Sequence, residues 1–590
     1  MGDFMYLKPS FNKKTGRTYL SMVKGYRAEG KKHPTAKTIK SFGYLDELEK
    51  KYDDPIAYFQ KIVDEYNEAE ELENAEYIIA AKKNQKLKKN TSTRRNYGYI
   101  IIMKVIYELG LDGFLLNRQY RDTKIECNTS SIMKMLIISR ILSPGSKRKA
   151  YEEMGRYFDF EKKDIFSLMD VYRSLSHFSG LAKDIQLQIH NRIMKNHGRS
   201  LDLIYYDVTN YYFEIDKEDE LRKKGYGKDG RKSPLVQMGL AMDADGIPIS
   251  YDVFPGNESE KLRLRPMVLE LHSKFESGRI IAVADSAQNT GNNIYYLDKG
   301  KQGYVFSQSI AGGSDDFKKY VIDEKGYKWH GEEYKRKSRN EIRKIKVDFE
   351  RSDGTTFKKT VEIEQRQIVF YSKKYAVRAK AKREDMIKKA QRIVDNPSAY
   401  TTATSYGALK YVDNIDVDEE TGEVKESKGI ACLNIDKIRE DEKYDGYYAI
   451  VTNIFNDGKN SGKFDDGKII DMYRGLWQIE DSFRVTKSDL ESRPVYVSRE
   501  DRIQAHFLTC FISLVILRLI QKKVKHRITP EALIETMNNI SCSHEGQNLY
   551  LFDYRSDESD MLGESFGIDF THERLTRKEI KKNIGDAKKA

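Results

Sequence analysis

The order of apolar segments between residues 201 and 307 constrains the fold of this chain more than any other feature. Three short strand patterns come first, and an alternation of helix, strand, helix and strand follows. The segments are residues 201–207, 236–242, 247–254, 261–275 (helix), 279–285, 289–300 (helix) and 303–307. Asp243-Ala-Asp-Gly246 joins the second and third strands as a hairpin turn. This order predicts an α/β fold with a mixed sheet flanked by helices.

Two of the predicted strands end on an acid, Asp207 and Asp285. Ligands of open α/β sheets bind at the carboxyl ends of the strands, so these two acids can converge. Carboxylate oxygens and a substrate phosphate together can hold Mg²⁺. Two such ions about 3.5–4 Å apart can activate a water or a 3′-hydroxyl and stabilise the leaving oxygen. The alternative is that each Asp forms a turn and nothing more.

A helical pattern over residues 473–487 supplies a third carboxylate. Spacings of three and four residues place one stripe of side chains together: Tyr473, Trp477, Glu480, Arg484 and Lys487. A neighbouring stripe is apolar and is expected to pack inward: Met472, Leu476, Ile479 and Phe483. A carboxylate beside two cations and two aromatic rings favours a phosphate-handling site, with Glu480 as the third acid. Trp477 fits either a surface for base stacking or the core.

The charge balance favours an anionic partner. The 590 residues include 103 Lys and Arg against 91 Asp and Glu, a net charge of +12, and nucleic acid is the first candidate for such an excess. Four basic segments could follow DNA phosphates, although each also fits a solvated surface. They are residues 86–95, 335–339, 378–389 and 574–582.

Other sequence features exclude several classes of protein. The four cysteines have no metal-binding or disulfide spacing, which fits a reducing cytoplasm. No Gly-x4-Gly-Lys-Ser/Thr loop is present, so no nucleotide cofactor is expected. The longest apolar run, Phe507 to Leu517, is too short to span a bilayer and predicts a buried helix instead.

Composition divides the chain into seven expected segments, because 590 residues exceed one compact core. They are a small β-rich region (1–45), a charged helical linker (46–95), a helical and DNA-binding domain (96–200), the first part of a catalytic core (201–310), a β-rich insertion (311–464), the second part of the core (465–530) and a basic C-terminal tail (531–590).

Several motifs resemble those of the IS4-type transposases of insertion sequences. The segments Tyr206-Asp207-Val-Thr209-Asn210 and Val283-Ala-Asp285-Ser-Ala resemble the first two catalytic blocks. Tyr473, Glu480 and Lys487 match the family pattern Tyr-x2-Arg-x3-Glu-x6-Lys, and residues 444–453 resemble a block of the IS1634-like branch. Leu476 stands where the pattern has an arginine, and Arg484 is the candidate for the missing cation.

The resemblance implies an RNase H-like catalytic core with a β-rich insertion, preceded by a mainly helical region. It implies binding of terminal inverted repeats, and then metal-dependent strand cleavage and strand transfer. Asp207, Asp285 and Glu480 would be the catalytic residues and would bind Mg²⁺ or Mn²⁺, as two ions. Tyr473, Trp477, Arg484 and Lys487 would contact DNA.

The partners implied are double-stranded DNA, as transposon ends and target, and a second copy of the chain in the DNA complex. The expected setting is the nucleoid of a bacterial or archaeal cytoplasm, without a membrane. Two alternatives stay open on the sequence alone. One is an RNase H-like nuclease without strand transfer, and the other is a DNA-binding descendant without catalysis.

Overall fold

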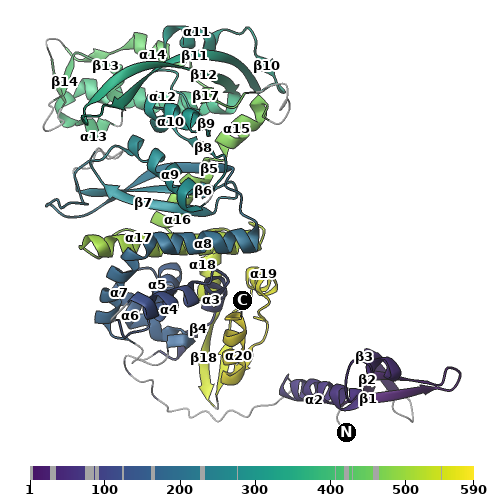
Figure 1. Cartoon of the computed structure of the whole chain (residues 1–590). Coiled ribbons are helices and arrows are strands. Elements are labelled where there is room, and N and C mark those ends of the chain that lie inside the picture. The colour runs from purple at the N-terminus through teal and green to yellow at the C-terminus, as the bar shows by residue number, and fades with distance from the viewer. Residues whose placement is uncertain are drawn as a thin grey trace. The chain divides into compact units, whose positions relative to one another are not determined.

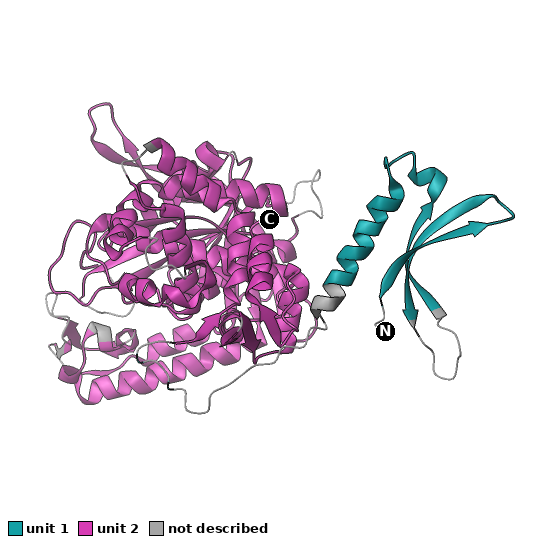
Figure 2. Cartoon of the chain, turned by 90° about the horizontal axis from the view of Figure 1, so that it is seen from below, with its two compact units in different colours: residues 1–91 teal, residues 92–590 magenta. Residues whose placement is uncertain are grey.

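The computed structural model describes two compact units, Met1–Thr91 and Ser92–Ala590 (Figure 2). The described residues are 4–26, 35–73, 86, 89, 92–122, 125–160, 166–225, 233–275, 277–405, 407–417, 424–427, 430–455, 464–546 and 548–589. The predicted basic run at residues 86–95 and the predicted linker up to residue 95 therefore fall partly outside the described residues.

The first unit is a three-stranded antiparallel sheet covered by a helix. Its elements are β1 (Met5–Asn12), β2 (Arg17–Tyr26), β3 (Thr35–Tyr44), α1 (Leu45–Leu48) and α2 (Pro55–Glu73). Phe59 of α2 packs with Leu20 and Leu48. The Asn67 side chain accepts from the Met5 N–H at 2.8 Å and donates to its carbonyl at 2.7 Å. The β-rich part ends at Tyr44, close to the expected residue 45, but α2 packs on it through an apolar face and belongs to the same unit, so it is not a separate linker.

The second unit is built on a nine-stranded mixed sheet, in the order β10-β11-β12-β17-β9-β8-β5-β6-β7. The strands at its centre and one edge are β5 (Leu203–Tyr212), β6 (Leu235–Asp243), β7 (Pro248–Pro255), β8 (Ile281–Ala284) and β9 (Gly303–Ser307). β5, β6 and β7 pair antiparallel, whereas β8 and β9 run parallel to β5. This strand order, with its directions, is the RNase H arrangement. The expected fold class is confirmed.

β5 is longer than the sequence pattern predicted. It continues past Asp207 to Tyr212, and the added residues pair with β6 as far as Leu235. The residues that follow Asp207 include Val, Thr and Tyr, which favour strands, so β5 continues beyond the acid. Asp207 therefore lies in the middle of β5, whereas Asp285 directly follows β8, as expected.

The segment 311–464 extends the same sheet beyond β9. Its strands β11 (Tyr334–Glu350) and β12 (Thr356–Ser372) form a long hairpin, and β17 (Tyr447–Thr452) pairs between β12 and β9. The short β10 (Lys328–Trp329) pairs with β11 and is the outermost strand at this edge of the sheet. The 23-residue helix α12 (Lys373–Asp395) follows the hairpin. β17 is mostly buried and pairs with β12 on one side and β9 on the other. The insertion therefore continues the core sheet, and α12 adds a helix to it.

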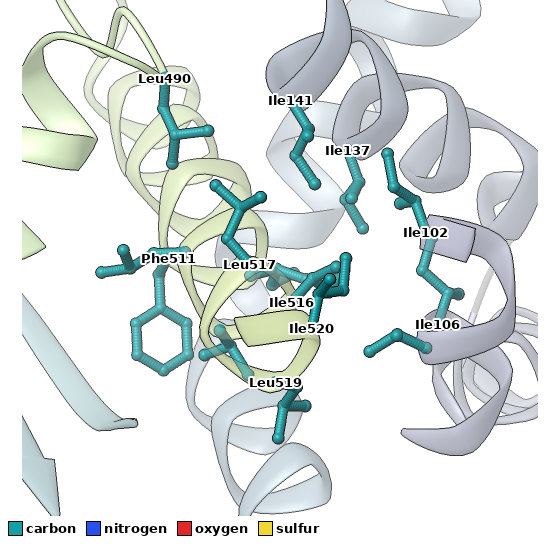
Figure 3. Close-up of a cluster of buried hydrophobic side chains, with 14 of the residues drawn as sticks. Ile102, Ile106, Ile137, Ile141, Leu490, Phe511, Ile516, Leu517, Leu519 and Ile520 are labelled. Carbon is teal, nitrogen blue, oxygen red and sulfur yellow. The ribbon is translucent and has the colours of Figure 1, made fainter. Parts of the chain in front are cut away.

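Helix α17 (Glu500–Lys523) is the centre of the hydrophobic core. It lies between the sheet and the helices that include α3 (Tyr99–Glu108) and α5 (Thr129–Leu142) (Figure 1). Figure 3 shows its side chains facing Ile102, Ile106, Ile137 and Ile141. Among the described residues, α17 is the one helix long and apolar enough to cross a membrane, with mean hydropathy 1.9, but 94% of that window is buried inside the protein. The prediction of a buried helix is confirmed.

The C-terminal segment 531–590 is folded, so the expectation of a basic tail is wrong. Its elements are α18 (Pro530–Asn539), β18 (Ser541–Gly546), β19 (Leu549–Phe552), α19 (Asp557–Phe566), β20 (Arg574–Thr576) and α20 (Arg577–Ala587). β18 pairs with β4 (Arg94–Asn96), far away in the sequence. Ile580, Ile584 and Ala587 are buried at helical spacing within the basic residues, and this apolar stripe orders the segment.

The stability of the protein should therefore depend on α20. Ile580 is fully buried, so Ile580→Ala is expected to lower the free energy of unfolding by about 2–5 kcal/mol. Lys581→Ala, at the exposed neighbouring position, is the matched control and should leave it within about 0.5 kcal/mol. Urea unfolding measures both. Equal stability of the two variants would mean that the segment does not pack on the core.

Candidate active site

The predicted helix over residues 473–487 is two helices, α15 (Asp466–Arg474) and α16 (Trp477–Lys487). Gly475 and Leu476 between them keep helical φ angles of −60° and −59°. The backbone there tightens to bonds three residues apart, as from the Leu476 N–H to the Tyr473 carbonyl at 3.0 Å. Tyr473 therefore belongs to α15, next to its last residue, whereas Glu480 and Lys487 belong to α16.

The parts of the two stripes from Leu476 onward face as predicted, whereas Met472 and Tyr473, on α15, are both half-buried. Leu476, Ile479 and Phe483 are buried, while Glu480 is exposed. Trp477 is 61% exposed, which overturns the alternative that it belongs to the core. α16 thus presents one carboxylate and one large ring away from the apolar interior.

Two contacts hold α16 against β5, one just before its first residue and one at its last residue. At the first end, a Cβ at Gly475 would lie only 1.8 Å from the Tyr205 hydroxyl, so only glycine permits this approach. At the other end, the Lys487 ammonium donates to the Thr209 hydroxyl at 2.5 Å. Tyr205 and Thr209 flank Asp207 on the same face of the strand, because side chains alternate along it. α16 therefore crosses the face that carries Asp207, with Glu480 between its two attachments.

Sequence reasoning missed Tyr205, Thr209 and Gly475 as supporting residues. The period of two along β5 identifies Tyr205 and Thr209 as neighbours of Asp207 on its face. Nothing in the sequence indicates which helix covers that face.

Asp285 lies level with Asp207 on the neighbouring strand. β5 and β8 are parallel, with Tyr205 opposite Val283. Continued two residues beyond the last paired residues, the same register places Asp207 level with Asp285, which directly follows the end of β8. The Asp285 side chain also accepts a hydrogen bond from the Ala287 N–H at 2.9 Å. The register thus brings two carboxylates together on one side of the sheet.

Tyr473 links α15 to the same region. Burial raises the pKa of its hydroxyl, a hydrogen bond with Ser307 opposes this shift, and the negative charges of Asp285 and Glu480 raise the pKa further. Ser307 ends β9, the strand next to β8. The Tyr473 hydroxyl is therefore a protonated donor within electrostatic reach of both carboxylates.

The donor set of this face is chemically suited to a hard divalent cation. Asp207, Asp285 and Glu480 offer only oxygen atoms, which Mg²⁺ prefers. One oxygen of Asp207 accepts from the Val208 N–H at 2.8 Å. Within the described part of the chain, no group of three or more His, Cys, Asp or Glu side chains is already gathered as a metal site. The three carboxylates thus share a face without forming a closed cluster.

Arg484, the candidate for the missing cation, is held by acids beside it. Its guanidinium lies 3.0 Å from Asp481 and 3.7 Å from Asp489. The hydrogen bond to Asp481 raises its pKa, and Arg518 binds the same carboxylate at 2.7 Å. Its proposed role toward DNA stays a prediction.

Buried basic side chains hold the loop that follows α16. Arg140 of α5 donates to the carbonyls of Leu490 and Glu491, at 3.1 and 2.9 Å. His506 of α17 bonds the Ser492 carbonyl at 2.8 Å, and Lys147 bonds the other ring nitrogen at 2.7 Å. Burial lowers the pKa of Lys147 to about 7. The sequence signal was present in α5, where Arg140 lies among mostly apolar residues of a largely buried helix.

Comparisons with known families match two parts of the chain. A family model described as "Transposase DDE domain" matches residues 212–516, more than half of the chain. A second, "IS1634 family transposase, N-terminal domain", matches residues 7–77. The first match includes Asp285 and Glu480 and begins five residues after Asp207.

Solved transposase structures resemble the chain only weakly. A piggyBac transposase synaptic complex with hairpin DNA is 8% identical, with 83% of this chain and 82% of that chain covered and a TM-score of 0.31. A Mos1 transposase paired-end complex is 12% identical over 41% and 66% of the two chains, with a TM-score of 0.14. A Mos1 mariner paired-end complex with Mn is 11% identical over the same shares, with a TM-score of 0.13. No curated protein matches.

Because Gly475 lies so close to Tyr205, replacing this glycine with alanine is expected to destabilise the protein. Gly475→Ala should lower the free energy of unfolding by about 1–3 kcal/mol, because its methyl group must displace Tyr205 or the helix. Gly113→Ala, in α4 (Leu111–Asp122), is the control, since no atom lies within 4 Å of the added Cβ. That change should raise stability by about 0.5–1 kcal/mol. Chemical unfolding of both variants decides, and a stabilising Gly475→Ala would contradict the close contact.

Proposed function

The chain belongs to the transposases with a DDE catalytic domain and has the N-terminal domain of the IS1634 family; from this premise we propose that Asp207, Asp285 and Glu480 are its catalytic residues. As a transposase it is an enzyme that cleaves DNA and transfers the strand, which favours this function over the nuclease and the non-catalytic protein. The observation that carries the proposal is the attachment of α16 across β5 at Tyr205 and Thr209, either side of Asp207.

Enzymes of this family use a divalent metal ion. Asp207, Asp285 and Glu480 would hold two ions, Mg²⁺ or Mn²⁺, supported by their all-oxygen chemistry and their common face. The chemistry supplied by such ions is stabilisation of charge on the phosphate and a lower pKa for an attacking water or 3′-hydroxyl. The protein's own part is to keep Asp207 and Asp285 in register on β5 and β8 and to hold Glu480 opposite them.

Four side chains around the carboxylates would bind the DNA backbone and bases. Lys487 is fixed at Thr209, beside Asp207, where its ammonium suits a phosphate near the scissile bond. The protonated Tyr473 hydroxyl can donate to a neighbouring phosphate oxygen. Trp477 exposes its ring, which suits stacking on an unpaired base. Arg484 would add a cation from α16.

Larger-scale roles follow from the same proposal. The helical region of residues 96–200 and the first unit would recognise terminal inverted repeats, and double-stranded DNA would be both donor and target. Two ends must be cut and joined together, so a homodimer in the DNA complex is part of the proposal. Its place of action would be the nucleoid of the cell.

Amide variants of the three acids test the assignment. Asp207→Asn, Asp285→Asn and Glu480→Gln should each reduce cleavage of DNA carrying the terminal repeats at least about 100-fold, since a metal ligand contributes several kcal/mol to the transition state. Each should still bind that DNA in a mobility-shift assay. Asp471→Asn is the matched control, an exposed acid on α15 that pairs with Arg474.

The outcomes are read on denaturing gels with Mg²⁺ present. The control should cleave and join like the unaltered protein. Full cleavage by any one of the three amide variants would remove that residue from the catalytic set.

A further inference from the structure

A cavity of about 720 Å³ lies beside the end of β5, apart from the carboxylates. Its walls come from the end of β5 and the residues after it, from α7 (Leu168–Gly180), from the loop after α16 and from α17. The lining residues central to its chemistry are Tyr172, Phe213, Arg222, Arg493, Tyr496 and Arg502. Its volume lies in the range of small-ligand sites.

The lining combines cations with aromatic rings. The Arg502 guanidinium lies 5.2 Å from the Tyr172 ring centroid, and that of Arg222 lies 5.4 Å from the Phe213 centroid. The Tyr496 ring is 55% exposed. Arg222 is paired with Asp219, whereas Arg493 and Arg502 form no ion pair within the described residues. Glu214 is the one acid among the described lining residues. The positive charges of Arg493 and Arg502 are therefore available to bind an anion in the cavity.

Its position connects it to the candidate active site. Tyr212, in the cavity wall, follows Asp207 by five residues on β5, which is about 17 Å along the strand. Lys487 lies between the two, bonded to Thr209 and 5.4 Å from the Tyr211 ring centroid. The cavity therefore lies farther along the chain of the strand that carries Asp207, beyond the residues that Lys487 contacts.

We propose that this cavity binds an unpaired nucleotide of the DNA strand that is held at Asp207, Asp285 and Glu480. Its base lies against Tyr496 and Phe213, and its phosphate binds Arg493 and Arg502. A base within a duplex is stacked on both faces, so only an unpaired or extruded base can enter such a pocket. Aromatic rings together with arginines bind single strands without regard to sequence. The inference rests on the proposed function, because it places the strand at the three acids.

Binding of a short single-stranded oligothymidylate tests the proposal without metal or cleavage. Tyr496→Ala and Arg493→Ala should each weaken its binding about tenfold, the loss expected for one stacked base or one phosphate contact. Arg499→Ala is the matched control, an exposed arginine of the same loop that pairs with Asp501 and does not line the cavity. Fluorescence anisotropy measures the dissociation constants, and a blunt duplex is the second probe.

The two probes separate the outcomes. The proposal is supported if both variants bind the oligothymidylate more weakly and Tyr496→Ala binds the duplex within about twofold of the unaltered protein. Unchanged oligothymidylate binding in both variants overturns it, and so does an equal loss for the duplex, which would indicate a general cationic surface. Failure of the catalytic assignment shows separately, as cleavage by the amide variants of the acids.

A measurement on the unaltered protein removes any dependence on the folding of variants. A photo-crosslinking oligothymidylate that contains 5-iododeoxyuridine should attach to the peptides that carry Tyr496 or Phe213, as read by mass spectrometry. Crosslinks found only on peptides away from the cavity would overturn the proposal.

Discussion

The attachment of α16 across β5 is the interaction on which the rest of this site depends. Asp207 and Asp285 come together by strand register alone, but Glu480 is far from both in the sequence. Its place is set by the close approach of Gly475 to Tyr205 and by the bond from Lys487 to Thr209. Because these contacts lie on either side of Asp207, the helix can neither slide along the strand nor swing away from it without breaking one of them.

The hydrophobic core behind the sheet supports this attachment. One cluster of buried side chains joins α3 and α5, the sheet, α16, α17 and the C-terminal helices. The helical region and the catalytic core are therefore stabilised together. Hydrogen bonds from Arg140 and His506, with Lys147 bound to His506, hold the loop after α16. That loop also forms a wall of the cavity, so one packed core sets both the carboxylates and the cavity.

Local patterns predicted much of the fold, and tertiary contacts set what they missed. β6, β7 and β9 follow from short apolar runs and a glycine turn, because those signals are complete within a few residues. The end of β5 was misplaced because pairing with β6 carries the strand past Asp207. The break at Gly475 depends on Tyr205, which is far away in the sequence. The C-terminal segment is ordered by a few buried apolar residues, which its basic composition did not indicate. Asp207 and Asp285 were predicted from the ends of apolar strand patterns, and Glu480 and the face of α16 from helical spacing; their supports were not predicted.

The metal site formed by the three carboxylates is tested most directly by anomalous diffraction from crystals of the protein grown with Mn²⁺ and DNA. Anomalous density is expected in contact with Asp207 and Asp285, with the Glu480 carboxylate reaching the same ions from α16. Density held elsewhere, or ions at the aspartates with Glu480 turned away from them in the DNA complex, would contradict it.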